Sequence, residues 1–468
     1  MGINQTQINM GYFIEQSVAN VWNRFHRQGS RSGSRGGLGI GRLMVDGRIS
    51  PAAVTIPHDK RAEHIAILGK TGSGKSMLLR HFASQDISDG RGFVFFDLHG
   101  DASPQLLKLI AARERDTRED LSTKLIVIEP ADREFSVGLN FIDQSVGQNS
   151  FVQIAEFAQV LKQRWHLDSF GARTEELLRN SLHLLADNRY SILELPPLLT
   201  SGPFRAACVR RSQNPEVKDY FALRYDRASE AMQATWRDAI LNKVSAFTAD
   251  PHFRHILGQL ESSFSLAEAI DSGYWIILNL DKGRLGEQAA TLGSLFLTKL
   301  KNALFARRSR KLLTLYCDEI QNLIVFDSGL DTLLSEARKF GASIVSANQF
   351  LDQHPPAMRS ALAAVGSHIY FQLSSGDAEK VAGTLDGGRT LTQELKNLPQ
   401  RHLISKSGHH RFLRAVVPNL AAPDADARDL MQRSLQRWAR RRSDIEAAIR
   451  QRHQGMRIAT SEVLHDWE

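Results

Sequence analysis

The residues most suited to chemistry form one short run, Gly69-Lys70-Thr71-Gly72-Ser73-Gly74-Lys75-Ser76, with the spacing G-x-x-x-x-G-K-S. Glycines at these positions allow backbone N–H groups to curl around phosphate oxygens, because no Cβ stands in the way. Lys75 would place a positive charge beside the β- and γ-phosphates, and the Ser76 hydroxyl would be a ligand of Mg²⁺. The run predicts a phosphate-binding loop (P-loop) for ATP and Mg²⁺. Its expected nucleotide-binding residues are Gly69, Lys70, Thr71, Gly72, Ser73, Gly74, Lys75, Ser76 and Met77.

The segments on either side of this run have the pattern that a P-loop needs. His64–Leu68 predicts a strand before it, and Met77–Phe82 begins a helix after it. The N-terminus of that helix would add a partial positive charge and unpaired N–H groups to the phosphate site. A simple glycine-rich turn would not explain this context.

A P-loop also needs carboxylates on a neighbouring strand. The apolar run Leu312–Cys317 leads directly into Asp318 and Glu319. We expect Asp318 to hold the metal together with Ser76, and Glu319 to polarise the water that attacks the γ-phosphate. Acidic strand ends are common, so this assignment depends on the P-loop.

Two further residues could complete the chemistry. Arg338 lies near the end of the helix that follows the Asp318 strand, and a guanidinium that reaches the γ-phosphate would stabilise the transition state. Gln349 follows the next strand, where it could sense the γ-phosphate or position water. The alternatives are that Arg338 is a surface cation at a helix C-terminus and that Gln349 is only a polar strand end.

The elements that would position these residues alternate between strands and helices. The predicted strands are short and nearly continuously apolar, as in strands buried on both faces: Ile65–Leu68, Phe93–Asp97, Leu125–Glu129, Tyr274–Leu280, Leu312–Cys317, Ala342–Ala347 and His368–Leu373. Helices are predicted between most of them, including Ser76–Ser84 and Ala289–Ala306. The fold class is therefore α/β with a mostly parallel sheet. Residues 151–260 interrupt the alternation with helical patterns and predict an all-helical insertion.

The two ends of the sequence differ from this core. Apolar residues in Ile14–Phe25 fall on one face of a helix, and Gly29–Gly41 reads as a flexible Gly/Ser/Arg linker. An Arg-rich helix after Pro418 would end in an irregular tail. The predicted domains are a terminal helix and linker (1–50), the two parts of the nucleotide-binding core (51–150 and 261–420), the helical insertion (151–260) and the basic C-terminal helix and tail (421–468).

Composition narrows the class of protein further. The 468 residues carry 59 Lys and Arg against 51 Asp and Glu, a net charge of +8, which is compatible with a nucleic-acid partner without indicating one. The two cysteines, Cys208 and Cys317, suggest neither a disulfide framework nor a thiolate metal site. No apolar stretch reaches the roughly 18 residues of a membrane span, so we expect no integral membrane segment and a cytoplasmic protein. Peripheral recruitment to the membrane is an alternative.

Together these motifs resemble those of the HerA–FtsK superfamily of DNA motors, and most closely the type IV secretion coupling proteins, the ATPases of conjugative DNA transfer. The similarity covers about Ile56 to Val417. It rests on Gly69–Ser76, Asp97–Asp101, Asn279–Gly286, Asp318–Asn322, Ser335–Lys339 and Ala347–Gln349, in this order. The end of the Phe93–Asp97 strand would face the nucleotide, where Asp97 and Asp101 could brace the metal site or the P-loop.

The resemblance implies a RecA-like P-loop core and a homo-oligomer, a hexamer with active sites between subunits. Lys75, Ser76, Asp318, Glu319 and Gln349 would form the ATPase site, and Arg338 would act on a neighbouring subunit. The implied function is a ring motor that hydrolyses ATP with Mg²⁺ to move DNA. Membrane-anchored members carry N-terminal transmembrane helices, and none is visible in this sequence. A secretion channel, a relaxase or a nuclease is a further partner to consider.

Two other functions stay open at this point. One is a cytosolic HerA-like motor of DNA processing or phage defence that works with a nuclease. The other is an ATP-dependent assembly switch, for instance in protein secretion, although a pure switch would not need Glu319. The basic residues that could contact DNA are Arg307, Arg308, Arg310, Lys311, Lys282 and Arg284, each of which could equally be part of a solvated surface.

Overall fold

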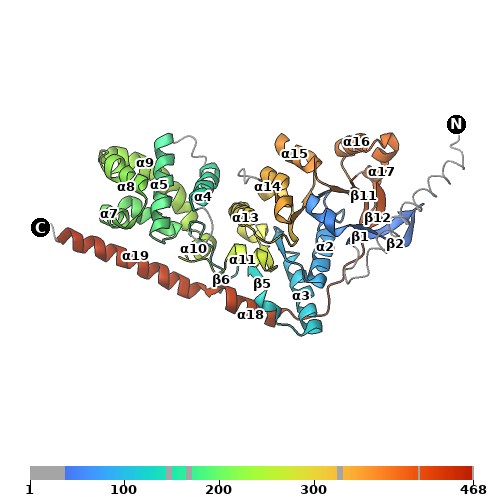
Figure 1. The fold of residues 1–468 in the computed structure, drawn as a ribbon, viewed down its shortest axis with the longest axis horizontal. Coiled ribbons are helices and arrows are strands. Elements are labelled where there is room, and N and C mark those ends of the chain that lie inside the picture. Colours follow the sequence, from blue (N-terminus) through green and yellow to red (C-terminus); the bar gives the residue numbers. More distant parts are fainter. Residues whose placement is uncertain (1–36, 144–149, 165–170, 324–329, 409–411, 466–468) are drawn as a thin grey trace. The chain divides into compact units, whose positions relative to one another are not determined.

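The computed structural model describes residues 37–143, 150–164, 171–323, 330–408 and 412–465. The chain forms two compact units (Figure 1). Unit 1 comprises Met1–Arg91, Leu312–Gln321 and Leu334–Pro423, and unit 2 comprises Gly92–Lys311, Asn322–Leu333 and Asp424–Glu468. The predicted helix Ile14–Phe25 lies outside the described residues.

The centre of unit 1 is a group of four parallel strands in the order β10-β3-β9-β8. Their bounds are β3 (Ile65–Leu68), β8 (Leu313–Asp318), β9 (Ala342–Asn348) and β10 (Ser367–Tyr370). Nearly all of their residues are buried, which explains the continuous apolar runs in the sequence. The four predicted strands are confirmed to within a few residues at each end.

Helix α2 (Lys75–Asp89) follows β3 and packs on β8 and β9. It buries Leu78, Leu79, Phe82 and Ile87, and it ends at Gly90, whose φ of 69° is in the left-handed region that favours glycine. Other helical segments of unit 1 are η1 (His58–Glu63), η7 (Ala337–Phe340), η8 (Leu351–Gln353), α15 (Pro356–Ala363), α16 (Ser375–Thr384) and α17 (Gly388–Asn397); η6 (Ile320–Leu323) and α14 (Leu330–Glu336) belong partly to each unit.

Four antiparallel strands extend this sheet, and the sequence analysis missed all of them. They follow the order β2-β1-β12-β11, and β11 pairs with β10. Their bounds are β1 (Leu38–Val45), β2 (Arg48–Ile56), β11 (His402–Ser407) and β12 (Leu413–Val416). The predicted linker was therefore too long: Leu38–Gly41 belongs to β1, where Leu38 and Ile40 are fully buried.

Unit 2 contains a second group of parallel strands, in the order β4-β7-β5. They are β4 (Phe93–Asp97), β5 (Leu125–Ile128) and β7 (Trp275–Asn279), all predicted from their apolar runs. Helices α3 (Ser103–Thr117) and α13 (Gln288–Phe305) belong to this part, and Phe96 on β4 packs edge-to-face on Phe296 of α13. The α/β class with seven predicted parallel strands is thus confirmed.

Between β6 (Phe135–Ser136) and β7, the described elements are all helical. They are α4 (Ser150–Arg164), α5 (Ala172–Asp187), η4 (Ile192–Glu194), α6 (Leu195–Thr200), α7 (Gly202–Arg211), α8 (Pro215–Asp219), the π-helical η5 (Tyr220–Tyr225), α9 (Glu230–Thr248), α10 (Pro251–Leu257) and α11 (Leu266–Asp271). The apolar positions that predicted helices here, such as Leu161 and Leu182, are buried. The domain boundaries proposed from the sequence stay a prediction.

The C-terminal region forms two helices, where the sequence predicted one helix and an irregular tail. Helix α18 (Arg428–Trp438) is followed by the two-residue strand β13 (Arg440–Arg441), which pairs with β6, and then by α19 (Arg442–His465). In Figure 1 the long α19 runs beneath α7 and α10, which it contacts. Ile445 and Ile449 of α19 are buried together with Leu193. The tail prediction failed because polar residues hide this short apolar stripe.

Both cysteines are free and buried. Within the described part of the chain, no helix combines the length and the apolar character needed to cross a bilayer.

Candidate functional site

The predicted site residues of unit 1 meet because three parallel strands end at the same level. Leu68 at the end of β3 pairs with Asn348 at the end of β9, and Asp318 at the end of β8 pairs with Ala347. The residues that follow, Gly69 and Gln349, therefore emerge at one edge of the sheet. Ligands of open α/β sheets bind at this carboxyl edge.

Glycine is required at two positions of the loop between β3 and α2. A Cβ on Gly69 would lie 2.6 Å from the Cβ of Phe371, which no relaxed structure tolerates. Gly74 has a φ of 120°, where side chains are strained, and it is the residue from which α2 begins. No side chain caps α2, so the first-turn N–H groups are left for an anion.

Lys75 is buried at the start of α2, and its ammonium group is held inside the loop. Its Nζ donates to the carbonyl oxygens of Gly69 (2.7 Å) and Lys70 (3.0 Å). Burial lowers the pKa of Lys75, while the charges of Asp318 and Glu319 oppose that shift. The group is thus a buried cation beside the loop, placed where phosphate oxygens could replace two carbonyls.

Ser76 and Asp318 are in direct contact, as a shared metal site requires. The Ser76 hydroxyl donates to Asp318 Oδ2 at 2.5 Å. One hydroxyl and one carboxylate oxygen beside a phosphate loop are the hard oxygen donors that Mg²⁺ prefers, and Mg²⁺ usually completes its shell with phosphates and water. No group of three or more potential His, Cys, Asp or Glu ligands occurs among the described residues. The residues present therefore fit the expected metal.

Glu319 and Gln349 are joined to each other and to the P-loop. Gln349 Nε2 donates to Glu319 Oε1, and Gln349 Oε1 accepts from the Thr71 hydroxyl at 3.2 Å. Glu319 has a φ of 51°, a left-handed conformation that is strained for a glutamate and typical of functional positions. The amide of Gln349 thus bridges the carboxylate expected to polarise water and the loop expected to bind phosphate.

Arg338 lies on η7, where its guanidinium contacts Glu63 at 3.2 Å. Its side chain is 62% exposed, and no interaction with P-loop residues occurs among the described contacts. Within one chain it is therefore a surface cation, and only its exposure agrees with a role in a neighbouring subunit.

The sequence analysis missed the residues whose backbone groups form hydrogen bonds with the P-loop backbone. The N–H of Lys70 donates to Gln372 O at 2.8 Å, and the N–H of Arg401 donates to Ser73 O at 2.8 Å. Phe371 and Arg401 also lie against Gly74. These contacts come from loops far away in the sequence, so no local motif could have indicated them.

Other candidates from the sequence have structural roles in unit 2. Asp97 accepts hydrogen bonds from the N–H groups of Gly100 and Ser103, which accounts for its burial; bracing of the metal site stays a hypothesis. Arg307 is buried against Asp271, and Arg284 binds Glu129. The prediction that Arg307 could contact DNA was wrong, because its guanidinium is buried and paired with Asp271.

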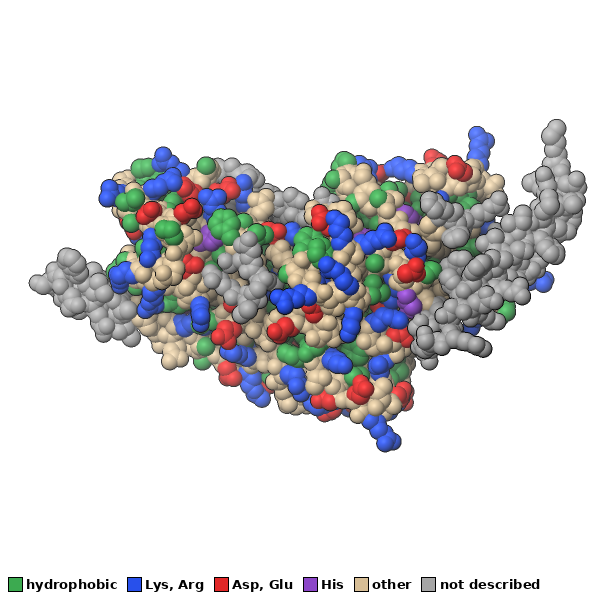
Figure 2. Space-filling model, in the orientation of Figure 1, with side chains coloured by type: hydrophobic (Ala, Val, Ile, Leu, Met, Phe, Trp, Pro, Cys, Tyr) green, Lys and Arg blue, Asp and Glu red, His purple; other side chains and the backbone are tan. Residues whose placement is uncertain are grey.

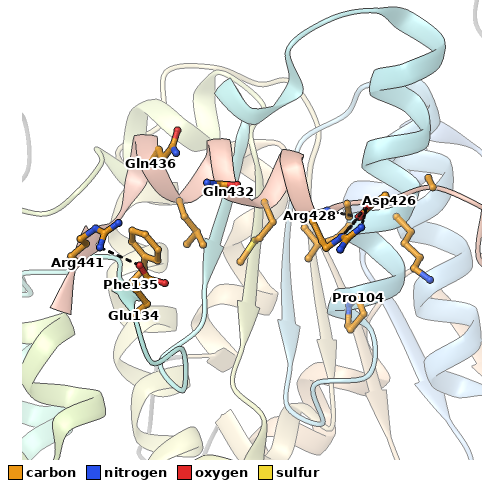
Figure 3. Close-up of a pocket in the computed structure, with 14 residues that line it drawn as sticks. Pro104, Glu134, Phe135, Asp426, Arg428, Gln432, Gln436 and Arg441 are labelled. Atoms are coloured by element: carbon orange, nitrogen blue, oxygen red, sulfur yellow. Dashed lines mark hydrogen bonds and ion pairs between the residues drawn. The ribbon is translucent and has the colours of Figure 1, made fainter. Parts of the chain in front are cut away.

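A groove of about 620 Å³ in unit 2 contains none of the predicted site residues. It lies between α3 and α18 over an apolar floor that includes Leu107 and Met431. Figure 3 shows Asp426 with Arg428 at one end, and Glu134 and Phe135 with Arg441 at the other. These charges pair with each other, so they would not orient a charged ligand.

The glycine loop, the acidic end of β8 and the parallel sheet define a RecA-like P-loop fold. A family model described as the type IV secretion-system coupling protein DNA-binding domain matches residues 48–399. The chain belongs to this family.

Solved structures of other proteins share this fold. The plasmid coupling protein TrwB with the non-hydrolysable ATP analogue ADPNP has a TM-score of 0.57 at 18% identity, over 86% of this chain and 94% of that chain. TrwB with ADP and Mg²⁺ has a TM-score of 0.55 at 19% identity, over 86% and 93%. VirB4 of Thermoanaerobacter pseudethanolicus has a TM-score of 0.54 at 15% identity, over 84% and 98%. A comparison with curated protein sequences finds no match.

Proposed function

We propose that this chain binds ATP with Mg²⁺, hydrolyses it, and uses the energy to move DNA through a ring of identical subunits. The observation that carries the proposal is the 2.5 Å contact between Ser76 and Asp318 beside the glycine loop. TrwB, which has the same fold, is seen in complex with an ATP analogue and with ADP and Mg²⁺.

Each residue of the site then has a defined part. Lys75 exchanges its two carbonyl partners for the β- and γ-phosphates, and the N–H groups of Gly69–Met77 surround them. Ser76 and Asp318 would hold the metal, which when bound would neutralise charge on the phosphates. Glu319 takes a proton from the attacking water, and Gln349 orients both Glu319 and that water.

Arg338 would complete the site of the next subunit in the ring. Its exposed guanidinium would leave Glu63 and stabilise charge on the γ-phosphate of the neighbour. Such a finger raises rates by about 10³- to 10⁵-fold in other phosphoryl-transfer enzymes. A hexamer is the expected assembly.

DNA is the proposed partner because the family is defined by a DNA-binding domain. A ring motor would grip phosphates with scattered basic side chains and without sequence preference. On the face shown in Figure 2, Lys and Arg are interspersed with Asp and Glu. Of the candidates from the sequence, Lys282, Arg284, Arg308, Arg310 and Lys311 are exposed, so they stay proposed contacts.

The pathway is part of the proposal as well. We favour DNA transfer of the conjugative type, in the cytoplasm, with a secretion channel or relaxase as partner. The cytosolic motor with a nuclease and the assembly switch remain the competing functions. Peripheral recruitment to the membrane stays a variant of the conjugative function.

The first test is ATP hydrolysis by the purified chain and by Lys75→Ala. The parent should hydrolyse ATP only with Mg²⁺, and Lys75→Ala should be inactive. Lys380→Ala is a matched control, because among the described contacts its ammonium pairs with exposed Asp352, and such pairs contribute little. ATP hydrolysis that persists in Lys75→Ala would contradict the assignment of the nucleotide site to this loop.

The second test separates a DNA motor from an assembly switch. DNA should stimulate hydrolysis, and the stimulation should fall as salt rises, because counterion release drives phosphate contacts. A response to DNA that is absent or independent of salt would favour the switch.

A further inference from the structure

A buried ion pair lies inside unit 1 at some distance from the P-loop. Arg61 of η1 and Asp86 of α2 have side chains with 0% exposure. Two parallel hydrogen bonds of 2.7 Å join Arg61 Nη1 and Nη2 to the two carboxylate oxygens of Asp86. A buried pair of this kind adds directional contacts, whereas apolar residues of equal volume often stabilise a core as well or better.

The same pair binds strand β8. Arg61 Nη2 donates to the Thr314 hydroxyl at 2.8 Å, and the Tyr316 hydroxyl donates to Asp86 Oδ2 at 2.6 Å. Burial, followed by the Asp86 charge, raises the pKa of Tyr316, so the phenol keeps the proton that it donates. We call Arg61, Asp86, Thr314 and Tyr316 the buried clamp.

Strand β8 presents the clamp and the metal ligand on one face. Thr314, Tyr316 and Asp318 alternate along the strand, so their side chains point to the same side. Helix α2 lies on that side, since both Ser76 and Asp86 of α2 contact it.

Helix α2 is therefore attached to β8 at two separate points. Ser76 and Asp86 are ten residues apart on α2, which corresponds to about 15 Å along a helix axis. A rigid helix attached at one point can pivot or slide, and attachment at both ends prevents this. A third contact, from the Ser343 hydroxyl to Arg61 O at 2.6 Å, fixes η1 to β9.

We propose that the buried clamp is a positioning device that sets the spacing of Ser76 and Asp318 for Mg²⁺ bound with nucleotide. The inference rests on the proposed function. Mg²⁺ demands near-ideal geometry at about 2.1 Å from each ligand, so a small shift of α2 against β8 weakens metal binding. The phosphates are held mainly by the loop backbone, so nucleotide binding without metal depends less on the clamp.

The test compares the affinity for fluorescently labelled ADP in EDTA and at saturating Mg²⁺, for the parent and for Tyr316→Phe. This variant removes one hydroxyl and leaves both Arg61–Asp86 bonds intact. We expect unchanged affinity in EDTA and a two- to tenfold smaller gain from Mg²⁺, because the hydroxyl makes one short hydrogen bond, to Asp86, worth about 0.5–1.5 kcal/mol, and a longer one of 3.4 Å from Arg61 Nη2. Tyr370→Phe is the matched control: this buried tyrosine on β10 has no hydroxyl hydrogen bond among the described contacts and should behave as the parent.

Arg61→Lys provides a second, stronger perturbation, because lysine keeps the charge but lacks the planar fork. It should reduce the gain from Mg²⁺ more than Tyr316→Phe does and raise the Mg²⁺ concentration needed for half-maximal hydrolysis. If Arg61→Lys does not fold, Thr314→Val replaces it, since valine keeps the shape and removes the hydroxyl that Arg61 binds.

The outcomes separate this inference from the proposed function. The clamp would be overturned if Mg²⁺ increased the ADP affinity of the variants as much as it does that of the parent. It would also be overturned if the variants lost the same affinity with and without Mg²⁺, because that indicates a general loss of structure. A parent that binds no nucleotide, or gains nothing from Mg²⁺, would instead overturn the proposed function.

Discussion

At the scale of single residues, Gln349 links the carboxylate expected to activate water with the loop expected to bind phosphate. Its amide binds Glu319 on one side and Thr71 of the P-loop on the other. Gln349→Ala should bind labelled ATP about as well as the parent and hydrolyse it on the order of 100-fold more slowly, because Glu319 and its water lose their orientation. Single-turnover hydrolysis together with equilibrium binding measures both effects.

A nearby glutamine provides the control for this prediction. Gln353 is exposed, and its side-chain oxygen accepts only the N–H of Phe350 among the described contacts. Gln353→Ala should keep the parent rate. If the two substitutions slow hydrolysis equally, Gln349 has no specific role in the reaction and is only a polar residue at the end of a strand.

Lys75 makes nucleotide binding depend on pH. Burial lowers its pKa in the free protein, and the phosphates of a bound nucleotide would raise it again. The charged lysine binds phosphate, so its contribution is complete below the pKa of the free protein and is lost as pH rises through the higher pKa of the nucleotide complex. Binding of ADP at alkaline pH should therefore take up protons, which calorimetry in two buffers with different ionisation heats detects.

Lys75→Arg is the diagnostic variant for this effect, since a guanidinium stays charged throughout the range. If it binds ADP, the proton uptake should disappear. Uptake that is unchanged would assign the proton to another group.

The residues of the site differ in how far the sequence could predict them. Lys75, Ser76, Asp318, Glu319 and Gln349 follow strands or open a helix, and parallel strands bring such positions together. The pair Arg61 and Asp86 was missed because single polar residues in ordinary segments read as surface, and only folding brings them to Thr314, which is 253 residues from Arg61. The catalytic roles of Lys75, Glu319 and Gln349 stay predictions.

At the scale of elements, the same logic separates the strands that were predicted from those that were missed. Strands such as β7 and β8 are buried on both faces and read as apolar runs. The antiparallel β2 contains Pro51 and mostly exposed or half-buried residues, and β1 contains two glycines, so neither pattern stands out. Antiparallel strands of mixed burial therefore carry the weakest signal.

Helix α19 offers a prediction at this scale. Ile449 is fully buried against the helical segment of unit 2, and flanking ion pairs join Arg254 to Glu446 and Arg452 to Glu194. Ile449→Ala should weaken this docking by roughly 2–5 kcal/mol, the usual range for such a truncation. Trypsin should then cleave after Arg450 and Arg452 faster than in the parent.

The exposed neighbour Ala448 supplies the comparison. Ala448→Ser should leave the cleavage rate unchanged. If Ile449→Ala is cleaved no faster than Ala448→Ser, the stability of α19 does not depend on its buried stripe.

At the scale of the whole molecule, the exposed position of Arg338 predicts that activity requires an assembly. Arg338→Ala and Glu319→Gln should each bind ATP and fail to hydrolyse it. Mixed rings should recover part of the activity, because an intact Glu319 in one subunit meets an intact Arg338 from its neighbour. The steady-state rate as a function of mixing ratio measures this recovery.

Lys339→Ala controls for the loss of surface charge, since Lys339 is 70% exposed beside Arg338. It should hydrolyse ATP normally. Mixtures that stay inactive at every ratio would exclude a finger supplied in trans.

The two buried cysteines have a practical consequence for observing such a machine at work. Burial raises the pKa of Cys208 to about 12 and that of Cys317 still further, so both thiols are protonated and shielded near neutral pH. One cysteine introduced at the exposed Lys380 position could therefore take up a maleimide dye alone, in a chain whose native thiols need no removal. Mass spectrometry should find a single label per subunit in the folded protein and three after denaturation, which would make the natural sequence a ready background for single-molecule fluorescence.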